Sequence, residues 1–260
     1  MSLIKKTVKF VLIFFVIMMF TTTVGATNKS ISWYCKRTKD HSLPPLADEL
    51  KFVEDYNTFW CDKNVASNDK VIYLTFDAGY ENGNVKRIVD ILKEENITGA
   101  FFILDNLIYS NEELVKEMIS NGNTVANHTA KHKNITLFNE KNELYEEISR
   151  LEKLYENKYG QSMPKYFRPP EGKFNEKALK WLDELGYKTV MWSFAYEDWS
   201  NNKQLSNEVA KKKILDNVHN GEVMLLHPTS KTNAEILKDV IKELKAQGYR
   251  FGSLDELCNK

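Results

Sequence analysis

Residues 71–79 read Val-Ile-Tyr-Leu-Thr-Phe-Asp-Ala-Gly, and this stretch decides the fold. Its first six residues are aliphatic, aromatic or β-branched, which is typical of a buried strand, and the glycine marks the turn that follows. Asp77 therefore stands where a buried strand meets a loop, the place where α/β enzymes hold their reactive groups. An aspartate that only caps the turn is the alternative interpretation.

Strand-length apolar runs alternate with helical periods over the rest of the chain. We expect strands at residues 71–76, 99–104, 124–127, 166–168, 188–194, 223–226 and 250–254, and helices at residues 84–95, 111–120, 141–159, 175–185, 205–219 and 233–246. This alternation predicts an α/β fold with a parallel sheet that is closed, or nearly closed, into a barrel. With 260 residues, 42% of them hydrophobic, the chain can build one substantial core.

The N-terminus has the pattern of an export signal. Three lysines precede an apolar run at residues 10–20, and residues 24–26 read Val-Gly-Ala. The run is short for a membrane span and the ending suits a cleavage site. We assign residues 1–26 to a signal peptide, with an uncleaved membrane anchor as the alternative. Either way the protein is expected outside the cytoplasm, and it would contact a membrane only through this segment.

Residues 27–68 are interpreted as a small N-terminal extension packed on a domain at residues 69–258. The extension lacks a clean period, apart from a candidate amphipathic helix at residues 46–59. The three cysteines, Cys35, Cys61 and Cys258, are an odd number, so at most one disulfide can form and the pairing stays open. With 36 basic and 36 acidic residues, the neutral chain argues against nucleic acid as a partner, and we expect a monomer.

Polar side chains recur at the carboxyl ends of the predicted strands. His128 and His132 follow one strand, and their spacing predicts two imidazoles on one face of a helical turn, where they can bind one divalent metal. Two solvated or helix-capping histidines are the alternative. Arg168 precedes a rigid Pro-Pro pair that would aim its guanidinium inward, unless it forms only a surface ion pair.

Two more strand ends carry groups suited to sugar chemistry. Asp198 lies beside Trp199, and aromatic faces are what sugar rings stack against. His227 ends an apolar strand, which is a natural place for a general acid. Together with Asp77 and the histidine pair, these residues form a candidate active site.

In order and spacing, these groups form five motifs, at residues 75–79, 128–132, 168–172, 198–199 and 225–227. Over residues 70–257 the chain resembles the polysaccharide deacetylases, the NodB-homology carbohydrate esterases of family 4. Residues 75–83, with Arg-Pro-Pro-Glu-Gly at 168–172, further resemble the subgroup that deacetylates N-acetylmuramic acid in peptidoglycan and makes the muramic δ-lactam of spore cortex. The resemblance implies a deformed (β/α) barrel of about seven parallel strands, with a groove open to a glycan strand.

The resemblance also implies a role for each motif residue. Asp77 would take a proton from water, and Arg168 would keep it ionised and oriented. His128 and His132 would hold a divalent metal, with Zn²⁺ as the expected ion, and the backbone N–H of Glu171 would help to stabilise the oxyanion.

The remaining motif residues are assigned to the leaving group and the sugar. His227 would protonate the departing amine, and Asp198 would keep that histidine cationic. Trp199 and Tyr80 are assigned to substrate binding. The expected substrate is a peptidoglycan glycan strand whose stem peptides have been removed.

Ala78 departs from the common family pattern, because most members carry there a second aspartate that completes the metal site. Two imidazoles without that carboxylate hold a divalent cation less tightly. The muramic-acid subgroup also lacks the second aspartate, so the sequence favours a muramic acid deacetylase. An N-acetylglucosamine deacetylase is the alternative within the same chemistry, and a non-catalytic glycan-binding module is the alternative of another class.

Overall fold

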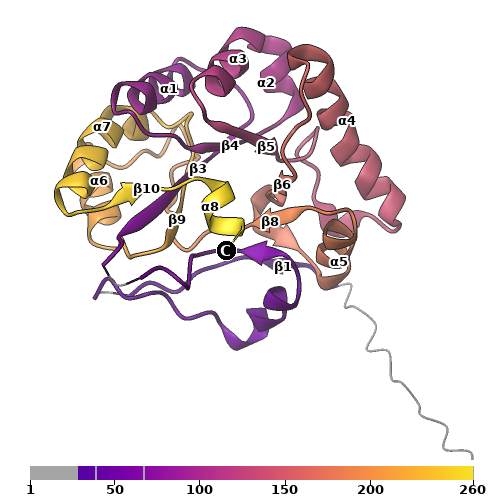
Figure 1. The fold of residues 1–260 in the computed structure, drawn as a ribbon, viewed down its shortest axis with the longest axis horizontal. Helices are drawn as coiled ribbons and strands as arrows, with labels where there is room; N and C mark the ends of the chain where they lie inside the picture. The colour runs from indigo at the N-terminus through magenta and orange to yellow at the C-terminus, as the bar shows by residue number, and fades with distance from the viewer. Residues whose placement is uncertain (1–28, 39, 67, 260) are drawn as a thin grey trace, which may run out of the picture.

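The computed structural model describes residues 29–38, 40–66 and 68–259, so the signal or anchor segment predicted at residues 1–26 lies outside it. One parallel sheet curls through the centre, helices surround it, and the N-terminal extension, drawn in indigo, runs along one side (Figure 1). In the described part of the chain, no helix is both long enough and apolar enough to cross a membrane.

Within the described residues, the central sheet has eight strands. They are β2 (Thr58–Phe59), β3 (Val71–Ala78), β4 (Ala100–Ile103), β5 (Thr124–Asn127), β6 (Tyr166–Phe167), β8 (Lys188–Val190), β9 (Glu222–Leu226) and β10 (Arg250–Phe251). β3 pairs with β4, β9 and β10, and the order continues through β5, β6 and β8 to β2, with parallel pairing throughout. The predicted barrel of about seven parallel strands is confirmed, and the eighth strand, β2, comes from the extension.

The extension also joins two strands that stand far apart in the sheet order. β2 pairs with β8, and shortly after it Cys61 forms an antiparallel bridge with Glu222 in β9. The N–H of Asp62 donates to the carbonyl of Gly221 at 2.8 Å. Residues 58–62 therefore connect β8 to β9 and close the curled sheet.

Seven helices lie around the outside of the sheet in the described chain, and an eighth covers one end of the barrel (Figure 1). They are α1 (Asn84–Glu94), α2 (Asp105–Ser110), α3 (Glu112–Ser120), α4 (Lys141–Tyr159), α5 (Glu176–Glu184), α6 (Asn207–Leu215), α7 (Lys231–Ala246) and α8 (Leu254–Cys258). Leu254 and Leu257 of α8 pack with Val71 and Tyr73 in the barrel interior. Neither α2 nor α8 is expected from the sequence, because both are too short to show a helical period.

The long helix α4 illustrates why the helices begin and end where they do. Glu140 and Glu143 form a capping box at its start, and Gly160, with a φ of 68°, ends it. Apolar side chains such as Leu144 and Ile148 recur every three to four residues and are fully buried. The helix therefore covers the core with one face and leaves the charged face to solvent.

Three expected elements differ in the structure. Residues 46–59 form a 3₁₀ helix, η1 (Asp48–Asp55), and then β2, in place of one α-helix. The strand expected at 188–194 ends at Val190, because the chain then crosses toward β9, where the N–H of Ser193 donates to the carbonyl of Val223 at 3.0 Å. Residues 250–254 contain only the short β10 before α8 begins. The remaining short elements are β1 (Ile31–Ser32), β7 (Lys173–Phe174), η2 (Ile135–Leu137) and η3 (Pro170–Gly172).

All three cysteines are free thiols in the structure. Cys61 and Cys258 are buried, and Cys35 is partly buried. Burial raises the pKa of Cys35 to about 11 and that of Cys258 to about 12, and it also raises the pKa of Cys61. The thiols are therefore protonated and unreactive at neutral pH.

We expect Gly221→Ala to destabilise the protein strongly, because its Cβ would lie 2.2 Å from the backbone oxygen of Asp62, where the extension meets β9. Gly186 is the matched control, since it also has a positive φ, of 78°, but no atom lies within 4 Å of an added Cβ. Gly186→Ala should lower the free energy of unfolding by about 1–2 kcal/mol, because alanine is strained in the left-handed conformation. Because of the additional clash, the free energy of unfolding of Gly221→Ala, measured in urea, should be about 1–3 kcal/mol lower than that of the Gly186→Ala control. Equal losses would show that the contact tolerates a side chain.

Candidate active site

The Arg168 side chain is fully buried and makes its hydrogen bonds inside the barrel, so the alternative interpretation, a surface ion pair, is wrong. Its guanidinium donates to Asp77 Oδ1, to Thr75 Oγ1 and to the Val190 carbonyl, each at 2.9 Å. It also stacks over the Phe102 ring, with 4.2 Å from Cζ to the ring centroid. A buried charge is tolerated only when it is paired and hydrogen-bonded in this way.

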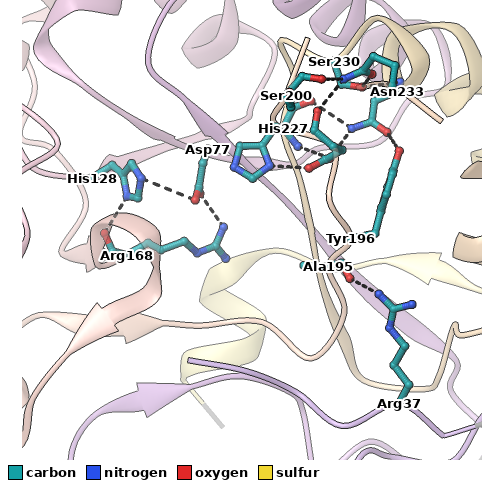
Figure 2. A network of polar contacts seen from close by, with 12 residues as sticks. Arg37, Asp77, His128, Arg168, Ala195, Tyr196, Ser200, His227, Ser230 and Asn233 are labelled. Atoms are coloured by element: carbon teal, nitrogen blue, oxygen red, sulfur yellow. Dashed lines mark hydrogen bonds and ion pairs between the residues drawn. The ribbon is translucent and has the colours of Figure 1, made fainter. Parts of the chain in front are cut away.

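Asp77 receives its charge state from these surroundings. Burial alone would raise the pKa of Asp77, but Arg168, His128 and His227 oppose that effect, and the pKa is lowered overall. The carboxylate is therefore ionised at neutral pH although it is almost enclosed. Figure 2 shows Asp77 between His128 and His227, with Arg168 next to it.

His128 and His132 do not lie on a helical turn, so that part of the sequence prediction is wrong. The loop after β5 contains two left-handed residues, Thr129 with a φ of 67° and His132 with a φ of 55°. Asn127 Oδ1 accepts the N–H of Thr129 at 2.8 Å and helps to hold this loop. The two imidazoles nevertheless come together, with ring centroids 5.1 Å apart.

The histidine pair has the chemistry that a metal ligand needs. His128 Nδ1 donates to the Arg168 carbonyl at 2.8 Å, which leaves Nε2 with its lone pair facing the cavity, 3.6 Å from Asp77 Oδ2. Burial lowers the pKa of His128 to about 4, so the ring is neutral. A neutral imidazole with a free nitrogen lone pair is a suitable ligand for a divalent cation. Ala78 lies in the apolar cluster under the helices, and no group of three or more His, Cys, Asp or Glu residues in the described chain forms a metal site.

On the opposite side of Asp77, His227 is paired with Asp198. His227 Nδ1 donates to Asp198 Oδ1 at 2.7 Å, and the backbone N–H of His227 donates to Asp198 Oδ2 at 2.8 Å. Burial lowers the pKa of His227, but the hydrogen bond and charge of Asp198, together with the charge of Asp77, raise it overall. The pair therefore keeps a proton on His227 at a higher pH than an ordinary histidine would.

Asn233, at the start of α7, supports this pair and is not predicted from the sequence. Its Nδ2 donates to Asp198 Oδ2 at 2.6 Å and to the His227 carbonyl at 3.1 Å (Figure 2). The Tyr196 hydroxyl donates to Asn233 Oδ1, which fixes the orientation of the amide. The contact spans 35 residues of sequence and has no local pattern that could reveal it.

One cavity of about 670 Å³ brings the predicted residues together. Its lining includes Asp77, Tyr80, His128, His132, Glu171, Trp199 and His227, while Arg168 and Asp198 lie buried behind it. Trp199 is 57% exposed at the rim, and Tyr80 is also exposed. Trp33 and Trp192 also line this cavity, and sequence reasoning did not assign either of them to the site.

Glu171 lies in the turn that follows the Pro-Pro pair. It has a left-handed φ of 57°, and the next residue, Gly172, has a φ of 61°. The Glu171 carboxylate pairs with Lys173 at 2.5 Å. Glu171 lines the cavity, so its backbone N–H, and not its charged side chain, is the group suited to act there as a donor. Two successive left-handed residues turn the backbone sharply at the cavity wall.

Comparison with known proteins identifies the family. A family model described as polysaccharide deacetylase matches residues 64–190. The peptidoglycan N-acetylmuramic acid deacetylase PdaA of Bacillus subtilis is 36% identical over 88% of this chain and 86% of its own length. This chain belongs to the polysaccharide deacetylase family. The predicted family and its enzyme class, hydrolases acting on amide bonds, are confirmed.

Solved structures of this family share the deacetylase fold. The structure of Bacillus subtilis PdaA, a family 4 carbohydrate esterase, matches with a TM-score of 0.84 over 89% of this chain and 97% of that chain. A further relative matches by sequence: a peptidoglycan N-acetylglucosamine deacetylase of Bacillus cereus is 33% identical over 74% of this chain and 90% of its own length. A family 4 pseudoenzyme from Bacillus anthracis also matches, at 27% identity and a TM-score of 0.67, over 74% of this chain and 66% of that chain.

We expect Asp198→Asn to lower the pKa of His227, because the variant loses the charged hydrogen-bond partner that contributes most to raising it. In an NMR titration of the metal-free protein, the His227 ring should titrate above the ordinary histidine value of about 6.5 in the wild type and below it in the variant. His219 serves as the internal reference, since burial lowers its pKa to about 4 and it lies outside this network. An unchanged His227 titration would contradict the assigned role of Asp198.

Proposed function

We propose that this deacetylase hydrolyses the N-acetyl group of N-acetylmuramic acid in peptidoglycan. The observation that carries the proposal is the ionised Asp77 beside Arg168, which faces the cavity between a neutral His128 and the His227–Asp198 pair. Amide hydrolysis needs a base for water, stabilisation of the oxyanion and an acid for the amine. Asp77 and His227 supply the base and the acid, the backbone N–H of Glu171 in the same cavity is assigned to the oxyanion, and the likeness to PdaA of Bacillus subtilis supports the choice of sugar.

Asp77 is assigned as the general base that takes a proton from the attacking water. Arg168 holds one oxygen of this carboxylate at 2.9 Å, so the other oxygen, near His128, is available to the water. Because Arg168 keeps the carboxylate ionised although it is almost enclosed, Asp77 can accept the proton of a water bound in the cavity. Arg168 acts through Asp77 and is a positioning residue.

His227 is assigned as the general acid. Its Nδ1 is held by Asp198, so Nε2 carries the proton that is delivered to the departing amine. Asp198 and Asn233 position the ring and help to keep it cationic. The backbone N–H of Glu171, in the sharp turn at the cavity wall, is assigned to the oxyanion.

His128 and His132 are the residues that would hold a divalent metal, and we propose Zn²⁺. When bound, such an ion supplies Lewis-acid activation of the water and of the acetamide carbonyl. The Arg168 carbonyl sets the tautomer of His128 and keeps its Nε2 available to a cation. With only two imidazoles and Ala78 in place of an aspartate, we expect weaker metal retention than a three-ligand site gives.

Trp199 and Tyr80, exposed at the rim, are assigned to the sugar rings of a glycan strand from which the stem peptides have been removed. Asn201 Nδ2 donates to the Tyr80 hydroxyl at 2.9 Å and steadies this side of the cavity. We place the enzyme outside the cytoplasm, in muramic δ-lactam formation in spore cortex. The assignment of residues 1–26, 27–68 and 69–258 to signal or anchor, extension and catalytic domain stays a prediction.

Two other functions have specific support. The 33% identical Bacillus cereus relative favours an N-acetylglucosamine deacetylase, which the same chemistry would serve. The pseudoenzyme relative and the small ligand set at His128 and His132 favour a glycan-binding module without activity. Product analysis by mass spectrometry, which shows the sugar that loses its acetyl group, separates the first from muramic acid deacetylation.

We expect the purified protein to release acetate from peptide-stripped peptidoglycan glycan, and Asp77→Asn to reduce kcat by about 10²–10⁴-fold, because an amide cannot accept the proton from water. Asp216→Asn is the matched control, since Asp216 is exposed and forms a surface ion pair with Lys212, away from the cavity. Acetate release should be measured with an enzymatic assay. Equal activity in wild type and Asp77→Asn would favour the glycan-binding module.

Removal of divalent metal should abolish acetate release, and added Zn²⁺ should restore it. His132→Ala should lower the metal content of the purified protein, measured by mass spectrometry, because one of the two imidazoles is lost. His41→Ala is the control, because His41 is exposed, whereas His219 is buried. Full activity in protein without detectable metal would refute the metal assignment.

A further inference from the structure

We propose that Trp33 is a specificity-determining residue that recognises the lactyl ether of N-acetylmuramic acid. Trp33 belongs to the N-terminal extension and stands outside all five motifs, yet it lines the same cavity as Asp77 and His128. The inference rests on the proposed function and names the part of that site that would distinguish muramic acid from glucosamine.

The extension holds Trp33 firmly against the turn that carries Glu171. β1 pairs antiparallel with β7, directly after this turn, and the backbone N–H of Trp33 donates to the Gly172 carbonyl at 2.8 Å. The Trp33 ring also packs near Trp60 and Phe174, with centroids 6.1 and 6.3 Å away. The side chain is therefore fixed before substrate arrives.

Gly172 shows how closely the two indoles fit around this turn. A Cβ on Gly172 would lie 2.6 Å from Trp192 Cη2 and 3.2 Å from Trp33 Cβ. Gly172 also has a positive φ of 61°, so only glycine suits both the conformation and the space. Trp33, Trp192 and Gly172 thus form one continuous apolar wall of the cavity.

The polar atom of Trp33 is already used. Its Nε1 donates to the Trp192 carbonyl at 2.8 Å, so the face toward the cavity offers no hydrogen-bond donor. In N-acetylmuramic acid the carbon next to the acetamide-bearing carbon carries a lactyl ether, which has a methyl group and, once the stem peptide is removed, a free carboxylate. N-acetylglucosamine has a hydroxyl there. An apolar wall buries the methyl favourably and leaves a hydroxyl without a partner, so the methyl is the part of the lactyl ether that meets Trp33, and the charged carboxylate must point away from this wall toward solvent.

The test compares Trp33→Ala and Trp33→Phe with Trp60→Phe, a matched control from the same aromatic cluster that is not among the residues lining the cavity. Two probes are used, peptide-stripped peptidoglycan oligosaccharides and N-acetylglucosamine oligomers. Their Kd values are measured by titration calorimetry, and kcat and KM by acetate release. Trp33→Ala should weaken binding of the muramic probe roughly tenfold and leave the glucosamine probe within about twofold.

Trp33→Phe should give a smaller loss on the muramic probe, and Trp60→Phe should change neither Kd. Equal losses on both probes, or the same losses in Trp60→Phe, would overturn the inference and leave Trp33 a purely structural residue. If Trp33→Ala does not fold, Trp33→Phe decides by the same ratio. If the wild type releases no acetate from the muramic probe, the proposed function fails, but the ratio of the two Kd values still tests the role of Trp33. If the wild type does not bind the muramic probe more tightly than the glucosamine probe, the inference about Trp33 is also overturned.

Discussion

The ion pair between Arg168 and Asp77 is the interaction on which the rest of the site depends. It brings together two strand ends, because Asp77 lies in β3 and Arg168 directly follows β6. The guanidinium is fully buried, and such a charge is tolerated only because its donors meet Asp77, Thr75 and the Val190 carbonyl. The same arginine offers its carbonyl to His128, so one residue sets the charge of the carboxylate and the tautomer of the imidazole.

The two central histidines have opposite properties because their Nδ1 atoms meet different partners. His128 is buried and His227 is partly buried, and burial lowers the pKa of an imidazole. His128 Nδ1 donates to a neutral carbonyl, so burial prevails and its pKa falls to about 4. His227 Nδ1 donates to Asp198, whose hydrogen bond and charge, together with the charge of Asp77, raise the pKa in spite of burial. One ring is thereby suited to bind a cation and the other to donate a proton.

The extension is part of the barrel in this structure. Its strand β2 pairs with β8, and Cys61 bridges to Glu222 in β9, so it connects two strands whose loops carry the acid and its partner. Through β1 it also brings Trp33 to the turn at Glu171. Stability of the closed sheet and shape of the cavity are therefore coupled, since the same segment supplies both.

The sequence alone determined the order of strands and helices and the residues with reactive groups. Apolar runs and helical periods are local, and so are the spacings around Asp77, His128, Arg168 and His227. Only the tertiary structure decided the loop of His128 and His132, where contacts with neighbouring elements stabilise left-handed residues that the spacing cannot reveal. It also decided Asn233 and Trp33, whose hydrogen bonds reach across 35 and 159 residues. Such contacts depend on how the chain returns to itself, and no local pattern encodes them.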